Sequence, residues 1–566
     1  MRIAAKPLQF GGTLCLWGRG RVLISVHGRG IARIGWGGPL TTVSDSKAAV
    51  KVLDPAAESL PRGDVLNFGG GARGVYRAGT SFLGVLTLVL IGLQFVFALY
   101  RRDMNDPDIW WHMRNAQYLL EHHQFPRTDM YSFTVAGHPW INHEWLAEIP
   151  YYFAYRAFGL VGLKTVCFLT FDAIFLVLLY LCFQESRNFK ASVFVCYFAT
   201  FLSTVSFGPR TVLFGYLYLV ILLVLLRRFR EQPGASLWAV PPLFLLWVNT
   251  HGSWSLGLIV FFLFVAAGLV QGSWVRVDAV RWTHKELQHL VTVGITSLAA
   301  LFVNPFGWRL VYYPFDMAFK QKLNIAHVAE WVSVDFHDLR GKMVLVLVFG
   351  LLLGALFRNR RWNLAELLIL LFALYSGLTY IRFLVLLGIV AAPVLAKQLD
   401  FFPLYRPADE TPRVNVAVII LLVGLMVWFW PSNAKIGASV EETYPSGVVG
   451  YLKSHPLQGN SLNFYLWGGY LEWHAPSLKT FVDSRVDIFE YAGVFEDYLS
   501  LMGADTTQHR PDAILNKYNV RYVLFPPSDS RNPLHTGGGL VYTLEQDPHW
   551  KMLYKDNTCV LLEKQQ

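Results

Sequence analysis

The chain has 566 residues, of which 54% are hydrophobic, 15% aromatic and only 16% charged. This composition excludes a soluble multidomain protein and indicates a polytopic α-helical membrane protein. The formal charge of +10 does not indicate a nucleic-acid-binding protein, because the basic residues form short clusters between apolar runs, such as RRFR at 227–230. Such clusters are topology signals.

Residues 1–78 are rich in Gly and Arg and contain no continuous apolar region followed by a small-residue cleavage site. We therefore interpret them as a mostly disordered cytoplasmic tail and not as a cleaved signal peptide. The alternative is that the true start of the protein lies nearer residue 75. Under either interpretation, no function is expected in this tail.

Eleven apolar segments follow that are long enough, or nearly long enough, to cross a bilayer. They cover 81–100, 161–183, 190–207, 211–227, 236–249, 254–272, 288–303, 342–357, 363–379, 381–398 and 413–430. A further apolar segment, 146–160, is short and carries Glu148, Pro150 and Arg156. We expect it to form a helix that lies at the membrane interface.

Clusters of Lys and Arg set the orientation of these segments. Strict alternation assigns the N-terminal tail and five loops to the cytoplasmic side: 185–190, 227–232, 273–287, 358–362 and 399–412. The external side then receives loop 101–160, the tip around Gly208 to Arg210, residues 249–254, loop 304–341, the turn around Arg382 and everything after Pro431.

The external loop 101–160 opens with DPDIWWH. Asp106 followed by Pro107 predicts a helix N-cap with proline in the first turn, and the helix should run to about His122. One face of this helix carries four residues at i, i+3, i+4 and i+7, namely Asp108, Trp111, His112 and Asn115.

A second cluster in the same loop is WINHEWLAE, in which His143 and Glu144 stand between tryptophans. A carboxylate beside aromatic walls can have a raised pKa, which suits proton transfer near neutral pH, and two carboxylates can divide the acid and base roles. Tryptophan faces also stack on sugar rings. Each cluster alone fits a helix-dipole aspartate and an interfacial aromatic belt, but together they predict a glycan site.

Five further polar residues lie at helix ends near the same predicted face: Arg210, Asn249, His251, Asn304 and Arg382. Such groups are costly near a membrane unless they are paired or line a wet cavity. Singly, each has a structural explanation as a snorkelling, turn or capping residue. Their convergence with the loop clusters favours a site, and two arginines opposite two carboxylates suggest a bound phosphate beside an acid/base pair.

After residue 440 the sequence alternates short helix-like and strand-like runs with Gly and Pro between them: GVVGYLKSH, SLNFYLW, LKTFVDSR, DAILNKYN, VRYVLFPP and CVLLEK. This pattern predicts a small soluble α/β domain over 440–566. The domain contains neither a GxGxxG nor a Walker sequence, and we favour a packing or capping role for it over substrate binding.

A first transmembrane helix, a large external loop with an early Asp and a later acidic residue, many further helices and a soluble C-terminal domain together resemble the GT-C superfamily of polyprenyl-phosphate-sugar-dependent membrane glycosyltransferases. The segments DPDIWWH, FPRTDMYSFT and WINHEWLAE are similar to those of bacterial proteins near the mannosyltransferase and aminoarabinose-transferase branches. The predicted fold is a polytopic α-helical membrane protein, GT-C-like over 79–430 with about eleven transmembrane helices. The resemblance implies a bacterial inner membrane, with the N-terminus cytoplasmic and the C-terminal α/β domain external.

The resemblance also implies inverting transfer of a sugar from a lipid phosphate or pyrophosphate carrier on the outer side of the membrane. It implies Asp108 as the general base for the acceptor hydroxyl, with Asp106 as the alternative. Glu144 would orient the acceptor or a metal, and Arg210 and Arg382 would hold the carrier phosphate. The predicted catalytic residues are Asp108, Glu144, His112 and His143, and the predicted substrate-binding residues are Asp106, Trp110, Trp111, Arg210, Asn249, His251, Asn304 and Arg382.

No cofactor follows from the sequence. His112 and His143 could join Glu144 around a divalent metal, but no HExxH-type spacing fixes such a set, and the second motif is His-Glu where the protein mannosyltransferases have Asp-Glu. The expected partners are a lipid-linked sugar donor, a glycan, lipid or protein acceptor and membrane lipid, with no nucleic acid.

Two other interpretations stay open. A glycan ligase or polymerase that works from a lipid pyrophosphate would depend more on Arg and His and less on Asp108. A non-catalytic transporter or glycan-assembly subunit would retain the architecture, although the two related halves that transporters usually show are not evident in the sequence.

Overall fold

The computed structural model describes residues 76–565, apart from 102, 105, 359, 400, 408–409, 503–510 and 532–536, and the backbone of three short strands nearer the N-terminus. These strands are β1 (Leu16–Gly18), β2 (Arg21–Ser25) and β3 (Ile31–Arg33), which pair antiparallel within the compact unit Met1–Pro61. Apart from these strands, residues 1–75 of the predicted tail lie outside the described residues. Arg62–Gln566 forms a second compact unit.

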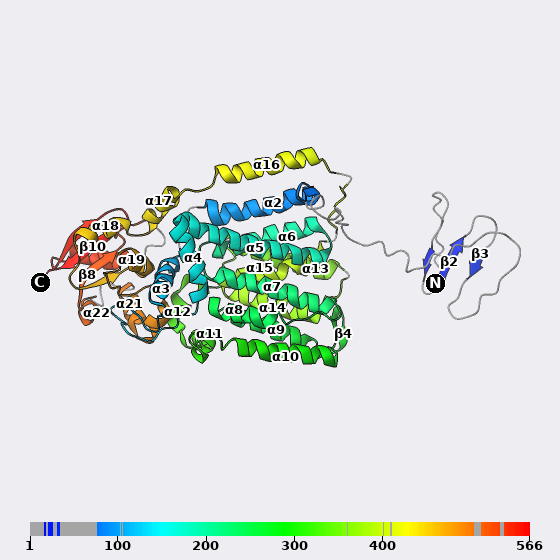
Figure 1. Cartoon of the computed structure of the whole chain (residues 1–566), viewed down its shortest axis with the longest axis horizontal. Coiled ribbons are helices and arrows are strands. Elements are labelled where there is room, and N and C mark those ends of the chain that lie inside the picture. Colours follow the sequence, from blue (N-terminus) through cyan, green and yellow to red (C-terminus); the bar gives the residue numbers. More distant parts are fainter. Residues whose placement is uncertain are drawn as a thin grey trace. The chain divides into compact units, whose positions relative to one another are not determined.

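Each of the eleven predicted apolar segments is helical, and Figure 1 shows most of these helices running side by side. They are α2 (Phe82–Gln94) with its π-helical extension η1 (Phe95–Tyr100), α5 (Leu160–Ser186), α6 (Phe189–Leu202) with η2 (Ser203–Ser206), α7 (Val212–Glu231), α8 (Val240–Thr250), α9 (Trp254–Ala267), α10 (His284–Ala300), α13 (Leu339–Phe357), α14 (Leu364–Thr379), α15 (Leu384–Gln398) and α16 (Pro412–Trp428). α15 lies at the centre of the bundle, where it packs against α5, α6 and α14 and buries most of its length.

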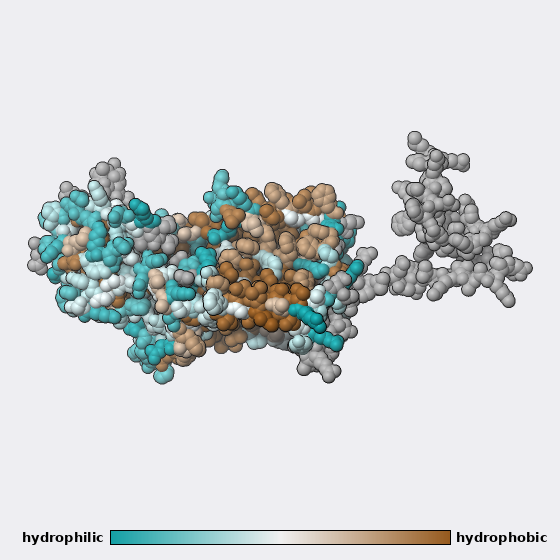
Figure 2. All heavy atoms as spheres, turned by 90° about the horizontal axis from the view of Figure 1, so that it is seen from above, coloured by the Kyte–Doolittle hydropathy of each residue, from teal (hydrophilic) through white to brown (hydrophobic). Residues whose placement is uncertain are grey.

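Six helical stretches in the described part of the chain are long and apolar enough to cross a membrane, and a seventh is formed if α16 and α17 (Asn433–Thr443), which meet at 55°, count as one span. α8, α9 and α14 are apolar but shorter, at 11, 14 and 16 residues. The prediction of a polytopic helical membrane protein is therefore confirmed, whereas the number of eleven crossings stays a prediction. Figure 2 shows hydrophobic side chains gathered over the helical part and hydrophilic ones over the C-terminal end.

The predicted cytoplasmic loops lie at one end of the bundle. Glu185 accepts ion pairs from Arg227 at 2.8 Å and Lys397 at 2.5 Å. A small sheet joins the 273–287 and 358–362 loops, since β5 (Val277–Ala279) pairs parallel with β6 (Trp362–Asn363). If the helices cross the membrane in strict alternation, these loops must share one end of the bundle, as they do here. Which side of the membrane this end faces stays a prediction.

The first loop folds as its sequence predicts. α3 (Asp108–His122) begins where the Asp106 carboxylate accepts a hydrogen bond from the Asp108 amide at 3.0 Å, and Pro107 already has helical φ and ψ. Asp106 therefore caps the helix. α4 (Trp145–Phe158) has 14 residues, which at about 1.5 Å per residue is too short to cross a bilayer; its place at the interface stays a prediction.

The C-terminal region is α/β, as predicted. Its four-stranded sheet has the order β7-β8-β10-β9, with β7 (Asn460–Asn463) parallel to β8 (Val520–Phe525) and the other pairs, β8 with β10 (Val560–Lys564) and β10 with β9 (Trp550–Lys555), antiparallel. The helices are α18 (Ser446–Ser454), α19 (Gly468–His474), α20 (Val486–Tyr491), α21 (Val494–Met502), α22 (Asp512–Lys517) and α23 (Gly538–Gln546).

One run in the C-terminal region departs from the predicted alternation. LKTFVDSR at 478–485 is not a strand of the sheet; it runs beside the first loop, where Thr480 forms a parallel bridge with Ser132. It presents Ser484 and Arg485 toward the first loop. Arg485 pairs with Asp129 at 2.7 Å in the buried interior between the two segments.

The first loop and the C-terminal region share one hydrophobic core, which includes Trp110, Tyr151, Tyr444 and Leu562. We call the described residues of 103–159 and 432–565 together the polar body. Because the two segments bury the same core, the first loop is held as a rigid part of this body and not as a free connection. This packing fixes where α3 and its polar face lie.

Candidate active site

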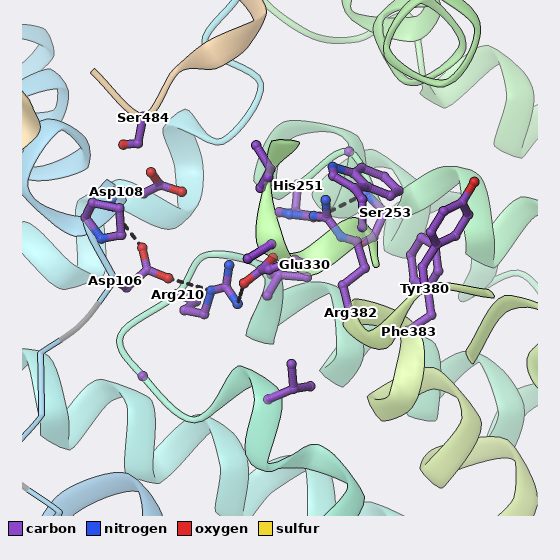
Figure 3. Close-up of a pocket in the computed structure, with 18 of the residues that line it drawn as sticks. Asp106, Asp108, Arg210, His251, Ser253, Glu330, Tyr380, Arg382, Phe383 and Ser484 are labelled. Carbon is purple, nitrogen blue, oxygen red and sulfur yellow. Dashed lines mark hydrogen bonds and ion pairs between the residues drawn. The ribbon is translucent and has the colours of Figure 1, made fainter. Parts of the chain in front are cut away.

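A cavity of about 1390 Å³ lies where the polar body meets the ends of the membrane helices. Its walls come from the first loop, from the connections before α7, before α9 and before α15, from the segment α11 (Trp308–Lys320) to α13 and from residues 465–487. A polar pouch of about 60 Å³ adjoins it and shares nine of its lining residues: Asp106, Asp108, Glu144, Arg210, Val212, Tyr216, His251, Glu330 and Arg382. Figure 3 shows the labelled side chains of this region.

The structure brings nine of the twelve predicted site residues to this cavity or its pouch. They are Asp106, Asp108, Trp111, His112, His143, Glu144, Arg210, His251 and Arg382. These side chains come from four separate stretches of the chain, and the reason they meet is that helix ends and the first loop all reach the same end of the bundle.

Three predicted substrate-binding residues lie elsewhere, which corrects their placement. Trp110 packs edge-on against Tyr444 and Tyr470 in the core of the polar body, because it is off the Asp108–His112 face of α3. Asn249 ties α8 to the end of α10, accepting from the Trp145 indole at 3.1 Å and donating to the Val303 carbonyl at 2.9 Å.

Asn304 is the third such residue. Its side chain closes a turn by donating to the carbonyls of Leu301 and Gly307 and accepting from the amide of Phe306 at 2.8 Å. Its hydrogen-bonding capacity is therefore used locally, in the turn role that its position before proline favours.

Arg210 is held between two carboxylates. Its Nε lies 2.6 Å from Asp106 Oδ2, and its Nη1 pairs closely with Glu330 (Figure 3). Glu330, in the 3₁₀ turn η3 (Ala329–Trp331), was not predicted from the sequence. With a carboxylate on each side, the guanidinium of Arg210 is already paired, so the expectation that Arg210 is free to hold a phosphate does not fit this geometry.

Arg382 has a different environment. Its guanidinium lies 4.2 Å above the ring of Trp331 and 5.9 Å from that of Phe383. No carboxylate among the residues that the structure describes lies within ion-pair distance of it. Stacking leaves the N–H groups at the edge of a guanidinium available for an anion, and Arg382 lines both the cavity and the pouch.

Asp108 is a titratable carboxylate of the site. Burial and the negative charge of Asp106 raise its pKa to about 7. Its contacts are weak ones: the Trp111 indole donates to its Oδ1 at 3.2 Å and to the Ser484 hydroxyl at 3.2 Å. Asp108 therefore exchanges a proton near neutral pH, at the wall of the cavity.

Glu144 is surrounded by imidazoles. Its carboxylate lies 3.2 Å from His112 Nε2, 3.1 Å from His251 Nε2 and 3.5 Å from His143 Nε2. Burial opposes ionisation, but these partners hold the pKa of Glu144 well below its usual range, so it is ionised. Within the described ranges, no group of three or more His, Cys, Asp or Glu is arranged to hold a metal ion.

Sequence reasoning missed four further residues at or beside the cavity besides Glu330: Glu148, Tyr313, Ser484 and Asp487. Burial raises the pKa of Asp487 to about 7, and the Tyr313 hydroxyl donates to it at 3.2 Å. Ser484 and Asp487 come from the C-terminal region, so this region contributes to the cavity wall as well as packing against the loop. In the sequence, the only local feature that marks Ser484 and Asp487 is the polar run DSRVD at 483–487.

No family model and no curated protein sequence matches this chain. Among solved structures, the oligosaccharyltransferase of Archaeoglobus fulgidus, tethered with an acceptor peptide, is 14% identical over 85% of this chain and 74% of that chain, with a TM-score of 0.46. The same enzyme, AglB, in complex with an inhibitory peptide and a dolichol-phosphate gives 12% identity over 84% and 73%, with a TM-score of 0.46.

The arabinofuranosyltransferase AftD from Mycobacteria is 14% identical over 86% of this chain, with a TM-score of 0.45; this chain covers 40% of its length. These TM-scores are below 0.5, so the likeness to the GT-C superfamily rests on the motifs of the first loop. The bacterial branch named for those motifs stays a prediction.

Proposed function

We propose that this protein is a membrane glycosyltransferase that transfers a sugar from a polyprenyl-phosphate carrier to an acceptor hydroxyl, with Asp108 as the general base. The observation that carries the proposal is that one large cavity has on its wall both Asp108, with a pKa raised to about 7, and Arg382, which has no ion-pair partner among the described residues. A base with a pKa near the working pH is the most effective one.

The reaction uses these residues in sequence. Asp108 takes the proton of the acceptor hydroxyl, whose oxygen forms a bond to the anomeric carbon of the sugar. The bond between that carbon and the carrier phosphate oxygen breaks, and the phosphate leaves with the electron pair. Arg382 stabilises the negative charge that grows on the phosphate. Glu144, ionised by its imidazole neighbours, orients the acceptor through hydrogen bonds.

The walls of the cavity support a lipid carrier. Phe97, Phe201 and Val205 line it from α2, α6 and their extensions, and Met343 lines it from α13. Apolar side chains on membrane-embedded helices, continuous with a polar pouch, suit a molecule with a hydrocarbon chain and an anionic head. The Lys and Arg residues of the opposite loops support an external position for this cavity by the positive-inside rule.

The test is a transfer assay on purified protein in lipid nanodiscs, with a panel of radiolabelled prenyl-phosphate sugars and a mixed acceptor extract of the cell envelope. The native chain should move label from the lipid to a more polar product. Asp108→Asn should reduce the rate by about 10²- to 10⁴-fold. The control, Asp335→Asn, changes an exposed aspartate that contacts only nearby His337 and should leave the rate unchanged. Equal rates for both variants would refute Asp108 as the base.

A further inference from the structure

A buried carboxylate behind the site takes no part in the reaction as written above. Glu148, on α4, is 0% exposed. Its Oε1 accepts from His112 Nδ1 at 3.0 Å and from the Asn115 amide at 3.2 Å, and its Oε2 accepts from the Asn142 amide at 2.8 Å. Three donors meet one carboxylate, and full burial without them would be costly.

The two amide donors to Glu148 are themselves held in place by further hydrogen bonds. Asn115 accepts from the buried Tyr131 hydroxyl at 2.7 Å. Asn142 accepts from the Glu144 amide at 3.3 Å. These contacts fix which end of each amide faces Glu148, so both amides donate to it. Burial raises the pKa of Glu148, and the hydrogen bonds from His112, Asn142 and Asn115 oppose this rise. A carboxylate that receives donors on both oxygens acts as an acceptor, which is the role of its ionised form.

His112 links this interior group to the cavity. Its imidazole is 2% exposed, with Nδ1 on Glu148 and Nε2 3.2 Å from Glu144 Oε2. The ring lies against Trp111, with the ring centroids 3.7 Å apart and the planes tilted by 40°, so a turn of the imidazole would change that contact. Both ring nitrogens face a carboxylate, and both must carry a proton for both contacts to be hydrogen bonds.

The charged groups around His112 agree with this state. Glu148 and Glu144 face it from α4 and its N-cap, and Asp108 faces it from its own helix. Burial lowers the pKa of His112, but the Glu148 hydrogen bond and the charges of Glu144 and Glu148 outweigh burial and raise it. The three residues Glu148, His112 and Glu144 thus form a negative–positive–negative line from the core to the cavity wall.

We propose that Glu148 and His112 are positioning residues: Glu148 fixes the imidazolium of His112, whose Nε2–H holds one oxygen of Glu144 so that its carboxylate stays ionised and oriented beside Asp108. The catalytic consequence rests on the proposed transferase function. The positioning does not, and it can be observed in the protein alone. A base oriented by a third group is a recurring arrangement in enzyme sites.

The first experiment reads the protonation of His112 directly. Magic-angle-spinning ¹⁵N spectra of histidine-labelled protein in lipid are recorded from pH 6 to about pH 9, a range centred above the ordinary histidine pKa of about 6.5. His112→Gln identifies the His112 signals by their loss. The native chain should keep both nitrogens of His112 protonated above the ordinary histidine pKa, and Glu148→Gln should convert His112 to a neutral imidazole at a lower pH than in the native chain. A matched control, Glu121→Gln, removes an exposed carboxylate from the same helix as His112 and should change nothing.

The second experiment measures transfer in nanodiscs with the same variants and the radiolabelled donor that the native chain uses. Glu148→Gln should lower kcat by about 10- to 100-fold, as expected when a group is misplaced by about 1 Å, with little change in KM for the lipid donor. Glu148→Asp keeps the charge but is one methylene shorter, so His112 should stay cationic while kcat falls by a smaller factor. If Glu148→Gln does not fold, Glu148→Asp is the variant that tests the proposal.

The outcomes separate the two proposals. A neutral His112 in the native chain at pH 7, or a His112 unchanged by Glu148→Gln, overturns the positioning proposal whatever the activity. The expected spectra in a chain that transfers no sugar from any donor in the panel support the positioning and refute the transferase function. The expected spectra with unchanged kcat in Glu148→Gln overturn the catalytic consequence.

Discussion

Two aspartates two residues apart have different roles because their surroundings differ. Asp106 is paired with Arg210 and caps α3, so its carboxylate is committed to structure. Asp108 has only weak donors and a buried, negatively charged neighbourhood. The motif places both residues at the start of a helix, but only the neighbours decide which one can exchange a proton.

The pH dependence of transfer should report Asp108. Its pKa is raised to about 7 by burial and by Asp106, and a general base acts in its deprotonated form. Transfer at saturating donor should therefore rise about tenfold per pH unit below pH 6 and level off above about pH 8. A rate that falls between pH 6 and pH 8 would contradict this assignment.

The same shift has a consequence for stability. The pKa of Asp108 is higher in the folded protein than its ordinary value of 3.8. The free energy of unfolding therefore decreases as the pH rises from about 4 to about 7, because ionising this buried carboxyl opposes folding. Asp108→Asn removes that cost, so its thermal midpoint at pH 8 should equal or exceed that of the native chain. A lower midpoint would show that the lost transfer activity reflects misfolding.

Arg382 and Arg210 should differ as phosphate ligands. Arg382→Gln should weaken binding of a polyprenyl phosphate by about tenfold or more, because a charge-assisted pair in a partly buried site is lost. Arg210→Gln should cost less affinity for the same lipid, although it leaves Asp106 and Glu330 without their partner and should lower the thermal midpoint. Scintillation proximity with labelled lipid measures the first effect, and a reversed order would contradict the assignment.

At the scale of elements, the turn η3 organises the cationic side of the site. Glu330 neutralises Arg210, and the next residue, Trp331, stacks on Arg382. The turn η3 thus holds Arg210 by an ion pair and Arg382 by a cation–π contact. The flanking elements are short, and α12 (Lys322–His327) is anchored by the Glu490 carboxylate, which accepts from the amides of Leu323 and Asn324 at 2.9 and 2.8 Å.

Removing the Glu330 charge should strengthen anion binding. Glu330→Gln leaves one more net positive charge at the pouch, so the Kd for a polyprenyl phosphate should fall by about three- to tenfold at low salt and by less at high salt. Asp335→Gln, at an exposed carboxylate in the same connection, is the control. Weaker lipid binding in Glu330→Gln would contradict this prediction and would mean that Glu330 contributes to binding only by positioning Arg210.

At the scale of the whole molecule, Arg485 joins the first loop to the C-terminal region. It is 3% exposed, pairs with Asp129 and Asp483 and lies over the rings of Tyr131 and Trp140. Arg485→Leu leaves two buried carboxylates without a counter-charge, which should destabilise the polar body by about 3–5 kcal/mol. Arg521→Leu breaks a pair with Glu563 that is partly exposed and should cost below about 1 kcal/mol. Denaturant unfolding with limited proteolysis of the loop measures the difference.

The orientation of the helix bundle is also testable. The four described cysteines are buried, so an added cysteine can be labelled selectively once Cys15 is replaced by Ser. A cysteine in place of the exposed Gln232 should react only from the cytoplasmic side, and one in place of the exposed Asp335 only from the outside. The opposite pattern would place the cavity on the cytoplasmic side and remove the basis for an external transferase.

Local sequence signals determined much of this protein. Apolar length set the positions of the membrane helices, Asp106-Pro107 set the start of α3, and the helical period put Asp108, Trp111 and His112 on one face. Trp110, which was predicted from the sequence to be substrate-binding, lies off that face and packs against Tyr444. These signals hold because they depend on residues within about one helical turn of each other.

Tertiary structure alone decided the partners of the charges. Glu330 reaches Arg210 across 120 positions in the chain, Arg485 reaches Asp129 across 356, and Glu148 lies behind His112 on a different helix. Such contacts depend on the path of the whole backbone, which no spacing in the sequence records. For this reason the sequence could bring the site residues to one end of the molecule, whereas only the fold could show that Arg210 is already paired, that Arg382 is open and that Asp108 titrates near pH 7.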